Sequence, residues 1–208
     1  NEGLHDVDEL QSYFVKRMEK FINSKGKKLI GWDEILEGGL APDATVMSWR
    51  GVKGGIAAAK QGHDVVMTPT SHCYFDHYQG PINDEPLAWG GYTPLSKVYK
   101  FDPVVDEMTK EEAKYVLGGQ ANLWSEYIPT KKQSQYMIYP RLAALSETLW
   151  SPKEFRNWNN FSSRMITMFS RYDYLGINYA KSAYLVTSNA QLNKKNNSIE
   201  VTLANEFP

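Results

Sequence analysis

The 208-residue chain carries 23 Lys and Arg residues against 24 Asp and Glu, a formal net charge of −1, and the two signs are mixed along the sequence. The sequence has no run of Lys and Arg that would form the basic stripe of a nucleic-acid-binding surface. No apolar run approaches the ~20 residues that a membrane span needs. Cys73 is the single cysteine, which excludes an intrachain disulfide and a cysteine-based zinc site.

The first half of the chain alternates helical and strand patterns. Apolar residues at helical spacing predict a helix from about Val7 to Asn23, with Asp6 or Asp8 as its N-cap. Short apolar runs predict strands at residues 28–32, 45–49 and 64–68, and an alanine-rich run predicts a helix at residues 54–61. A long irregular segment, rich in Gly, Pro, Tyr and Asp, follows from Pro69 to about Pro103.

The second half continues the alternation. A fourth strand is predicted at residues 116–124, and helices at residues 134–149 and 154–175, with Pro140 near a kink or a helix start. Arg141 and Glu147 lie on the first of these helices, and we expect them to be structural ion-pair partners. The tail at residues 198–208 alternates apolar with polar residues, which predicts a strand.

Short apolar strands that alternate with helices indicate an α/β fold with parallel strands. Four strand–helix units in a row fit half of a (β/α)8 barrel, and 208 residues fall short of the ~250 that a whole barrel typically needs. The alternation alone would equally allow a small doubly wound sheet. We expect residues 1–185 to form the half-barrel, and residues 186–208 to be a linker and the first strand of a truncated C-terminal β domain.

Aromatic and acidic residues gather where the predicted strands end. The ends carry Trp32–Asp33–Glu34, Trp49–Arg50–Gly51, Tyr74–Phe75–Asp76 and Trp124–Ser125–Glu126. In a (β/α)8 barrel, functional side chains lie at the carboxyl ends of the strands. Aromatic walls combined with a few placed carboxylates are typical of a pocket for a carbohydrate, because Trp and Tyr present a flat apolar face to a sugar ring.

Four ordered segments resemble those of the β-N-acetylhexosaminidases of glycoside hydrolase family 20. They are Gly31–Trp32–Asp33–Glu34–Ile35–Leu36, Val46–Met47–Ser48–Trp49–Arg50–Gly51, Cys73–Tyr74–Phe75–Asp76 and Gly118–Gly119–Gln120–Ala121–Asn122–Leu123–Trp124–Ser125–Glu126. The later run from Tyr139 to Trp150 resembles the last barrel helix of that family. The resemblance covers about residues 10 to 180 and implies that the chain is the C-terminal half, strands 5 to 8, of a TIM-barrel catalytic domain.

The resemblance also implies roles for the aromatic residues. Trp32, Trp49 and Trp124 would form a hydrophobic box around the acetamido methyl group, and the hydroxyl of Tyr74 would hydrogen-bond the acetamido oxygen. The family cleaves with assistance from the substrate, whose acetamido oxygen attacks the anomeric carbon, so it needs no protein nucleophile. An aromatic box would serve this reaction by positioning.

Two carboxylates complete the implied sugar site, and the general acid of the family is missing from the chain. Asp76 and Glu126 would accept hydrogen bonds from the O6 and O4 hydroxyls of the sugar. The family takes its general acid from an Asp–Glu pair in a His-x-Gly-Gly-Asp-Glu motif, which this sequence lacks. By the order of the family this motif would precede residue 1. The 208-residue sequence also has no initiator Met and no signal peptide, so we expect it to be a processed or excised piece of a longer chain.

Asp33–Glu34 is an Asp–Glu pair at a strand end, but it follows Gly–Trp rather than Gly–Gly and belongs to the next strand of the family order. We therefore expect these carboxylates to orient loops or to line the rim, and not to be the catalytic pair. Trp89 and Tyr92, in the long irregular segment, could form a further sugar subsite.

Three interpretations follow. The first is an exo-acting, retaining hydrolase that removes terminal β-linked GlcNAc or GalNAc from glycans or chito-oligosaccharides. In this interpretation the longer parent protein is active and the isolated 208-residue chain is inactive. The second is a non-catalytic carbohydrate-binding module, and the third is a structural half-barrel that needs a partner. We expect no cofactor and no metal, no nucleic-acid partner, no membrane span, and a homodimer formed through the open half-barrel. The family resemblance suggests a periplasmic, cell-surface or secreted protein.

Overall fold

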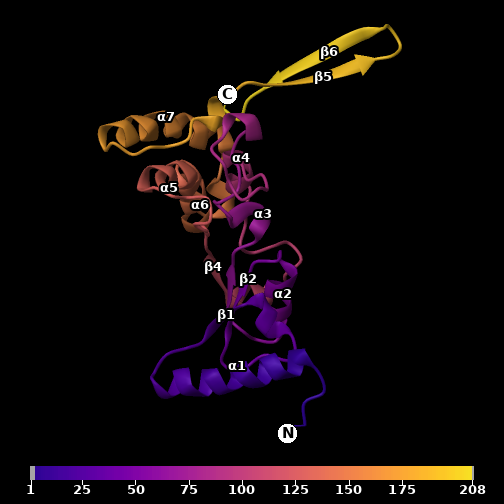
Figure 1. The fold of residues 1–208 in the computed structure, drawn as a ribbon, viewed down its shortest axis with the longest axis vertical. Coiled ribbons are helices and arrows are strands. Elements are labelled where there is room, and N and C mark those ends of the chain that lie inside the picture. Colours follow the sequence, from indigo (N-terminus) through magenta and orange to yellow (C-terminus); the bar gives the residue numbers. More distant parts are fainter. Residues whose placement is uncertain (1–2, 208) are drawn as a thin grey trace. The chain divides into compact units, whose positions relative to one another are not determined.

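The computed structural model describes residues 3–207, which fold into two compact units (Figure 1). The first unit, called the sheet unit below, runs to residue 74 and includes residues 102–122. The second, the helical unit, contains residues 75–101 and the chain from residue 123 onward. The long irregular segment predicted from the sequence therefore contributes to both units.

The sheet unit is built on parallel strands. Within the described residues the strands are β1 (Ile30–Trp32), β2 (Thr45–Ser48), β3 (Val65–Met67) and β4 (Val116–Gly119). They lie in the order β1-β2-β3-β4, and each pair is parallel. The predicted α/β class is thus confirmed. Each described strand neighbours the next one along the chain, so the strand order of this sheet does not reverse within residues 3–207. A doubly wound sheet requires such a reversal.

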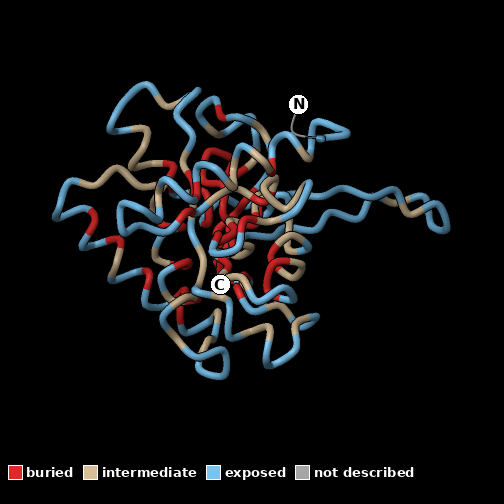
Figure 2. The backbone as a smooth tube through the Cα atoms, turned by 90° about the horizontal axis from the view of Figure 1, so that it is seen from below, coloured by how far each residue is buried: buried red, intermediate tan, exposed pale blue. Residues whose placement is uncertain are grey.

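One helix precedes these strands and two others connect them, and the helices help to bury the core of the sheet unit. They are α1 (Val7–Ser24), α2 (Lys53–Lys60) and the single turn α3 (Thr70–Cys73). Asp6 is the N-cap of α1, and its carboxylate accepts a hydrogen bond of 2.8 Å from the backbone N–H of Glu9. The core residues Val46, Val65, Met67, Ala58 and Ala59 are each at most 2% exposed. The buried positions are coloured red in Figure 2.

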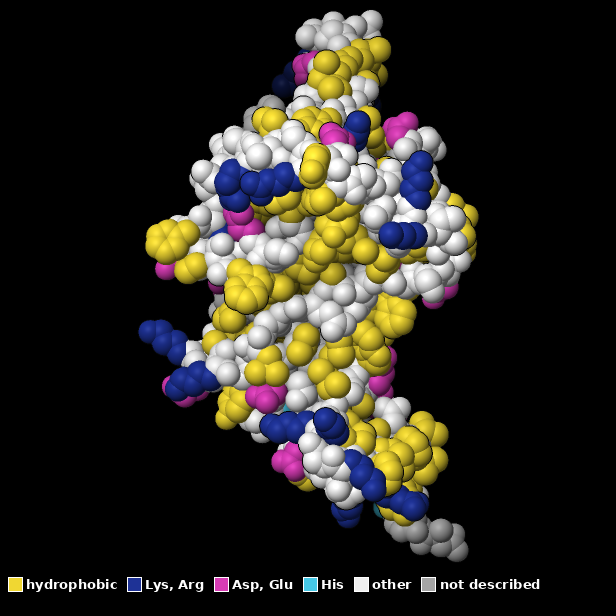
Figure 3. Space-filling model, turned by 90° about the vertical axis from the view of Figure 1, so that its left-hand side faces the viewer, with side chains coloured by type: hydrophobic (Ala, Val, Ile, Leu, Met, Phe, Trp, Pro, Cys, Tyr) yellow, Lys and Arg dark blue, Asp and Glu magenta, His cyan; other side chains and the backbone are white. Residues whose placement is uncertain are grey.

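Helix α1 does not bury the face that its hydrophobic pattern predicts. It packs through Ser12, Val15, Glu19 and Ile22, while an apolar stripe points outward. The stripe consists of Val7, Leu10, Phe14, Met18 and Phe21, which are 36% to 77% exposed. Figure 3 shows exposed hydrophobic side chains in the lower part of the view, where α1 lies. No helix within residues 3–207 combines the length and the apolar composition that crossing a bilayer requires.

The helical unit contains α4 (Leu95–Tyr99), α5 (Lys131–Ile138), α6 (Arg141–Trp150) and α7 (Trp158–Tyr174). The single helix predicted at residues 134–149 is thus two helices. Tyr139 between them is extended (φ −100°, ψ 137°), because the ring of Pro140 disfavours the helical conformation in the preceding residue. Helix α7 begins later than predicted, after Asn157, whose side chain caps it by accepting from the N–H of Asn160 at 2.9 Å.

The expected ion pair between Arg141 and Glu147 is wrong. Arg141 is fully buried at the start of α6 and donates to backbone carbonyls instead of to a carboxylate. Glu147 lies further along the helix, where it accepts hydrogen bonds from the Tyr99 hydroxyl at 2.8 Å and from Arg164 at 2.5 Å. The two residues are six positions apart, which places them on different sides of the helix.

The C-terminal part forms a hairpin of β5 (Thr187–Asn193) and β6 (Ser198–Ala204), seen as a two-stranded ribbon in Figure 1. Strand β6 was predicted and is confirmed, whereas β5 was not predicted. Cross-strand pairing of Leu192 with Ile199 and of Ala190 with Val201 places these apolar residues on one face. After the hairpin, Phe207 is 3% exposed and packs among the aromatic rings of Trp158, Phe169 and Tyr184. The predicted domain division at residues 185/186 stays a prediction.

Candidate functional site

The sheet unit positions three of the aromatic residues singled out from the sequence. Trp32 is the last residue of β1, Trp49 directly follows β2, and Tyr74 directly follows α3 behind β3. Since β1, β2 and β3 are parallel neighbours, their carboxyl ends meet at one edge of the sheet. Trp32 and Trp49 are half-buried and Tyr74 is buried, so their rings combine packing with access from outside.

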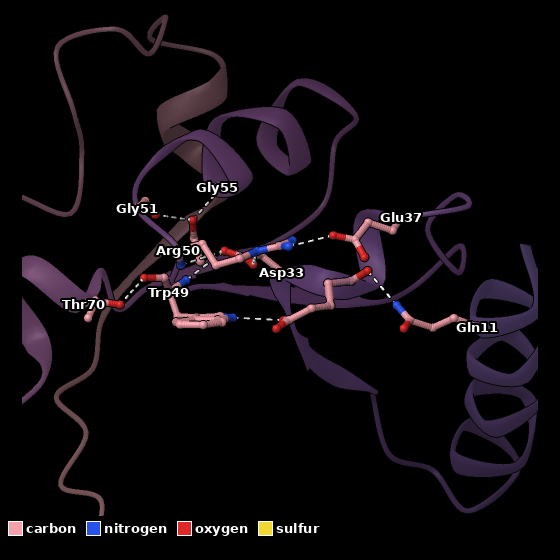
Figure 4. A network of polar contacts seen from close by, with 10 residues as sticks. Gln11, Asp33, Glu37, Trp49, Arg50, Gly51, Gly55 and Thr70 are labelled. Atoms are coloured by element: carbon pink, nitrogen blue, oxygen red, sulfur yellow. Dashed lines mark hydrogen bonds and ion pairs between the residues drawn. The ribbon is translucent and has the colours of Figure 1, made fainter. Parts of the chain in front are cut away.

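Trp49 is held by the acidic pair that follows β1 (Figure 4). The carboxylate of Asp33 accepts a hydrogen bond of 3.0 Å from the backbone N–H of Trp49. The indole Nε1–H of Trp49 donates to Oε2 of Glu34, also at 3.0 Å. The Trp49 carbonyl in turn accepts hydrogen bonds from the backbone N–H and the hydroxyl of Thr70. The backbone and the ring edge of Trp49 are therefore both fixed.

Asp33 is fully engaged by this network. It is 2% exposed, and among residues 3–207 it also accepts hydrogen bonds from the backbone N–H of Arg50 at 3.1 Å and from its Nε at 2.6 Å. Arg50 additionally donates to Glu37 at 2.7 Å, and these hydrogen bonds to Glu37 and Asp33 raise the pKa of Arg50 above its usual value. A Cβ at Gly54 would lie 2.9 Å from the Cβ of Asp33, so the glycine lets α2 approach the carboxylate.

Tyr74 stacks on Trp49. Their ring centroids are 6.2 Å apart, and the ring planes make an angle of 24°. Asn122, which follows β4, forms a parallel bridge with Tyr74 and donates its backbone N–H to the carbonyl of Cys73 at 2.8 Å. Its side-chain amide donates to the hydroxyl of Thr68 at 2.6 Å. Asn122 therefore anchors the segment before Tyr74, a role that sequence reasoning missed although the residue lies in a quoted motif.

Asp76 is the central polar residue of the helical unit. It is 4% exposed, and within the described part of the chain its Oδ1 has no hydrogen-bond partner. Burial, and to a smaller extent the charge of Glu126, raise the pKa of Asp76, whereas Arg141 and the backbone N–H of Trp124 lower it. A buried carboxylate oxygen without a donor costs stability, so this atom is well suited to accept a hydrogen bond from a ligand.

The segment after β4 brings the other predicted residues of the helical unit near Asp76. Trp124 is 42% exposed, and Glu126 is exposed but close enough to act on Asp76 electrostatically. Trp89 donates its backbone N–H to the carbonyl of Asp76 at 3.2 Å, and its exposed ring lies 5.9 Å from that of Tyr127, centroid to centroid. The helical unit thus combines two carboxylates with several accessible aromatic rings.

The predicted site residues therefore fall into two sets. The sheet unit holds Trp32, Trp49 and Tyr74, of which Trp49 and Tyr74 are in contact. The helical unit holds Asp76, Trp124 and Glu126, which interact with one another through Asp76. Over residues 3–207, no group of three or more His, Cys, Asp or Glu side chains is arranged to hold a metal ion.

Comparison with known proteins gives a consistent family. Residues 1–153 match the family described as glycosyl hydrolase family 20, catalytic domain. A β-hexosaminidase from Porphyromonas gingivalis is 54% identical over 178 residues, which are 85% of this chain and 23% of that protein. A β-hexosaminidase from Vibrio furnissii is 36% identical over 148 residues, 70% of this chain and 24% of that protein. The chain thus spans about a quarter of the length of these curated relatives.

Solved structures agree with the sequence comparison. The crystal structure of the family 20 exo β-N-acetylglucosaminidase from Vibrio harveyi in complex with N-acetylglucosamine superposes with a TM-score of 0.80 at 33% identity, covering 86% of this chain and 29% of that chain. The β-N-acetylhexosaminidase from Streptomyces coelicolor gives a TM-score of 0.73 at 27% identity, over 82% of this chain and 36% of that one. With these neighbours, the mixed α/β fold is related to the TIM barrel. The chain belongs to glycosyl hydrolase family 20.

Proposed function

We propose that this chain supplies the sugar-binding wall of a β-N-acetylhexosaminidase that removes terminal β-linked GlcNAc or GalNAc from glycans or chito-oligosaccharides. Family membership and relatives named β-hexosaminidase support the reaction. The neighbour from Vibrio harveyi was crystallised with N-acetylglucosamine, which supports the sugar. The order of the four strands supports an arc that is half of a (β/α)8 barrel.

The observation that carries the proposal is the buried Oδ1 of Asp76. A carboxylate oxygen that is desolvated and has no donor within residues 3–207 gains most from a hydroxyl group, and sugars are rich in hydroxyls. Glu126 is a second carboxylate in its electrostatic range. In this proposal Asp76 and Glu126 accept hydrogen bonds from the O6 and O4 hydroxyls of the terminal sugar.

The aromatic residues act on the acetamido group in the same proposal. Trp32, Trp49 and Trp124 enclose its methyl group, and the Tyr74 hydroxyl holds its oxygen for attack on the anomeric carbon, with retention of configuration. The stacked and hydrogen-bonded surroundings of Trp49 support a rigid wall, which a positioning mechanism needs.

The general acid of this reaction comes from outside the 208 residues in our proposal. The sequence contains no His-x-Gly-Gly-Asp-Glu motif. In the one similar pair at a strand end, both carboxylates accept hydrogen bonds. Asp33 accepts from N–H groups of Trp49 and Arg50, and Glu34 accepts from the indole N–H of Trp49. A carboxylate committed in this way is poorly placed to deliver a proton to a leaving group.

The test measures two properties of the purified chain, after circular dichroism has shown that it is folded. Hydrolysis of an aryl N-acetyl-β-glucosaminide reports turnover, and titration calorimetry with N-acetylglucosamine reports binding. Binding without turnover is expected. Turnover would contradict the external acid, and a folded chain that neither binds nor cleaves would favour the purely structural half-barrel.

The assembly is part of the same proposal. The outward apolar stripe of α1 and the apolar face of the hairpin support a homodimer or another partner that covers them. The amphipathic hairpin also supports residues 186–208 as the first strands of a β domain, since an isolated two-stranded hairpin is marginally stable in water.

A further inference from the structure

The Asp33–Glu34 pair is conspicuous in the sequence, and the proposed reaction gives it no chemical role. It lies in the turn that directly follows β1, within the network of Figure 4. Asp33 is 2% exposed and acts on the backbone of Trp49 and on Arg50. Glu34 is half-buried, and its carboxylate accepts a hydrogen bond from the indole ring of Trp49. The two carboxylates therefore divide the work of holding one tryptophan.

We infer that Glu34 is a positioning residue, whose hydrogen bond to the indole Nε1–H fixes the ring of Trp49 in the plane needed to form the sugar-binding wall. The inference rests on the proposed role of Trp49 in that wall. It adds a residue from the neighbouring strand, which touches no sugar in the proposal and acts only through the tryptophan.

Contacts with four residues together explain why the ring has one orientation. The backbone of Trp49 is held by Asp33 and Thr70, which fixes where its Cβ points. The stacked ring of Tyr74 covers one face at 6.2 Å. The ring could still rotate about the Cβ–Cγ bond, because the preferred values of that torsion are broad for a tryptophan. The bond from Nε1 to Glu34 at 3.0 Å is the contact that opposes this rotation.

The backbone of Glu34 is itself anchored, so that its carboxylate is a fixed point. Its carbonyl accepts hydrogen bonds from the side-chain amide of Gln11 on α1 at 2.8 Å and from the backbone N–H of Glu37. A hydrogen bond to a charged acceptor is about twice as strong as a neutral one. Binding sites work best when such supporting residues lock the groups that touch the ligand.

Two substitutions separate the hydrogen bond from the charge. Glu34→Ala removes the acceptor, whereas Glu34→Gln keeps an acceptor oxygen of the same reach and removes the charge. The matched control is Glu111→Ala, because Glu111 is an exposed carboxylate of the sheet unit whose partner is Lys114. All variants are made in the full chain.

The first readout is the indole N–H resonance of Trp49 in the ¹⁵N-labelled chain, assigned by its loss in Trp49→Phe. Hydrogen bonding to a carboxylate moves this proton downfield. In Glu34→Ala we expect an upfield shift, in Glu34→Gln a smaller one, and in Glu111→Ala none. The second readout is the affinity for N-acetylglucosamine. We expect this affinity to fall about tenfold in Glu34→Ala, as for the loss of one charge-assisted hydrogen bond, and to stay within about twofold in Glu34→Gln.

Each outcome decides the inference. An unchanged Trp49 resonance and an unchanged affinity in Glu34→Ala would overturn it. Equal loss of affinity in both Glu34 variants, with the resonance unmoved, would also overturn it, because Glu34 would then act by its charge. If Trp49→Ala leaves the affinity unaltered, the proposed function of Trp49 fails, while the resonance still reports whether Glu34 holds the ring.

Discussion

Asp76 combines a burial cost with a proposed binding role, so one substitution should move stability and affinity in opposite directions. Asp76→Asn keeps the shape of the side chain and removes the charge that burial disfavours. We expect the variant to melt at a higher temperature than the parent at pH 7, and to bind N-acetylglucosamine about tenfold more weakly, as for loss of a hydrogen bond to a charged group. Calorimetry measures both quantities.

The pH dependence of this prediction has a definite sign. Because the pKa of Asp76 is raised in the fold, the folded chain binds more protons than the unfolded chain between the ordinary and the raised value. Stability contributed by the protonated form is therefore lost as pH rises through that window. The thermal advantage of Asp76→Asn should shrink as the pH falls towards about 4, the ordinary aspartate value. The exposed Asp84→Asn, in the same segment, should change neither property; equal effects in both variants would contradict the argument.

At this scale the sequence predicted residue types well and contacts poorly. The aromatic residues at the strand ends could be found because parallel strands bring their carboxyl ends together. The anchoring contacts of Glu34 and Asn122 could not, since each depends on a partner that lies far away in the chain. Arg141 shows the same limit: its place on one helix with Glu147 suggested an ion pair, whereas its actual partners are backbone carbonyls, three of them in a distant segment.

Arg141 joins α6 to the long segment that carries Asp76. Its guanidinium donates to the carbonyls of Phe75 and His77, on either side of Asp76, and to that of Thr93. The ring of Phe75 also lies below the guanidinium, with its centroid 4.8 Å from Cζ. Burial lowers the pKa of Arg141 to about 9, so the side chain keeps its charge at neutral pH.

Removing this link should be costly. Arg141→Met leaves four buried carbonyls, those of Phe75, His77, Thr93 and Met137, without this donor. We expect the free energy of unfolding to fall by about 3 kcal/mol in urea denaturation. Arg164→Met is the matched control on α7, because Arg164 is 55% exposed and pairs with Glu147. A surface ion pair whose arginine is largely exposed contributes about 1 kcal/mol or less. Equal losses in the two variants would show that the carbonyl contacts of Arg141 carry no special weight.

The secondary-structure elements were predicted well where a pattern was long and regular. Helix α1 was found because its apolar periodicity extends over the whole element, and the short parallel strands were found because each is a compact apolar run. The division between α5 and α6 was seen only as a kink, although the effect of Pro140 on Tyr139 is local. Strand β5 was missed because its sequence, Thr187–Asn193, contains little beyond Ala190 and Leu192 to mark a strand.

For the whole molecule, the apolar stripe of α1 predicts association. Phe14 and Phe21 are 59% and 60% exposed, on the outward side of the helix. We expect the chain to self-associate at micromolar concentration in sedimentation velocity, and Phe14→Glu/Phe21→Glu to shift it towards the monomer.

The control changes charge without touching the stripe. Lys20→Glu/Lys27→Glu alters two exposed lysines in or next to the same helix and should leave the association as in the parent. A parent chain that sediments as a monomer at all concentrations would contradict the prediction, as would association that the two phenylalanine substitutions do not weaken.

Cys73 is fully buried next to Tyr74, and burial raises the pKa of its thiol. Maleimides and similar reagents attack the thiolate, so this cysteine should stay unlabelled in the folded chain. Because it is the single cysteine of the sequence, a new one at an exposed position, such as Lys195→Cys in the turn between β5 and β6, would be the sole reactive site. A fluorophore or nitroxide attached there would report the motion of the hairpin without any need to replace the native residue.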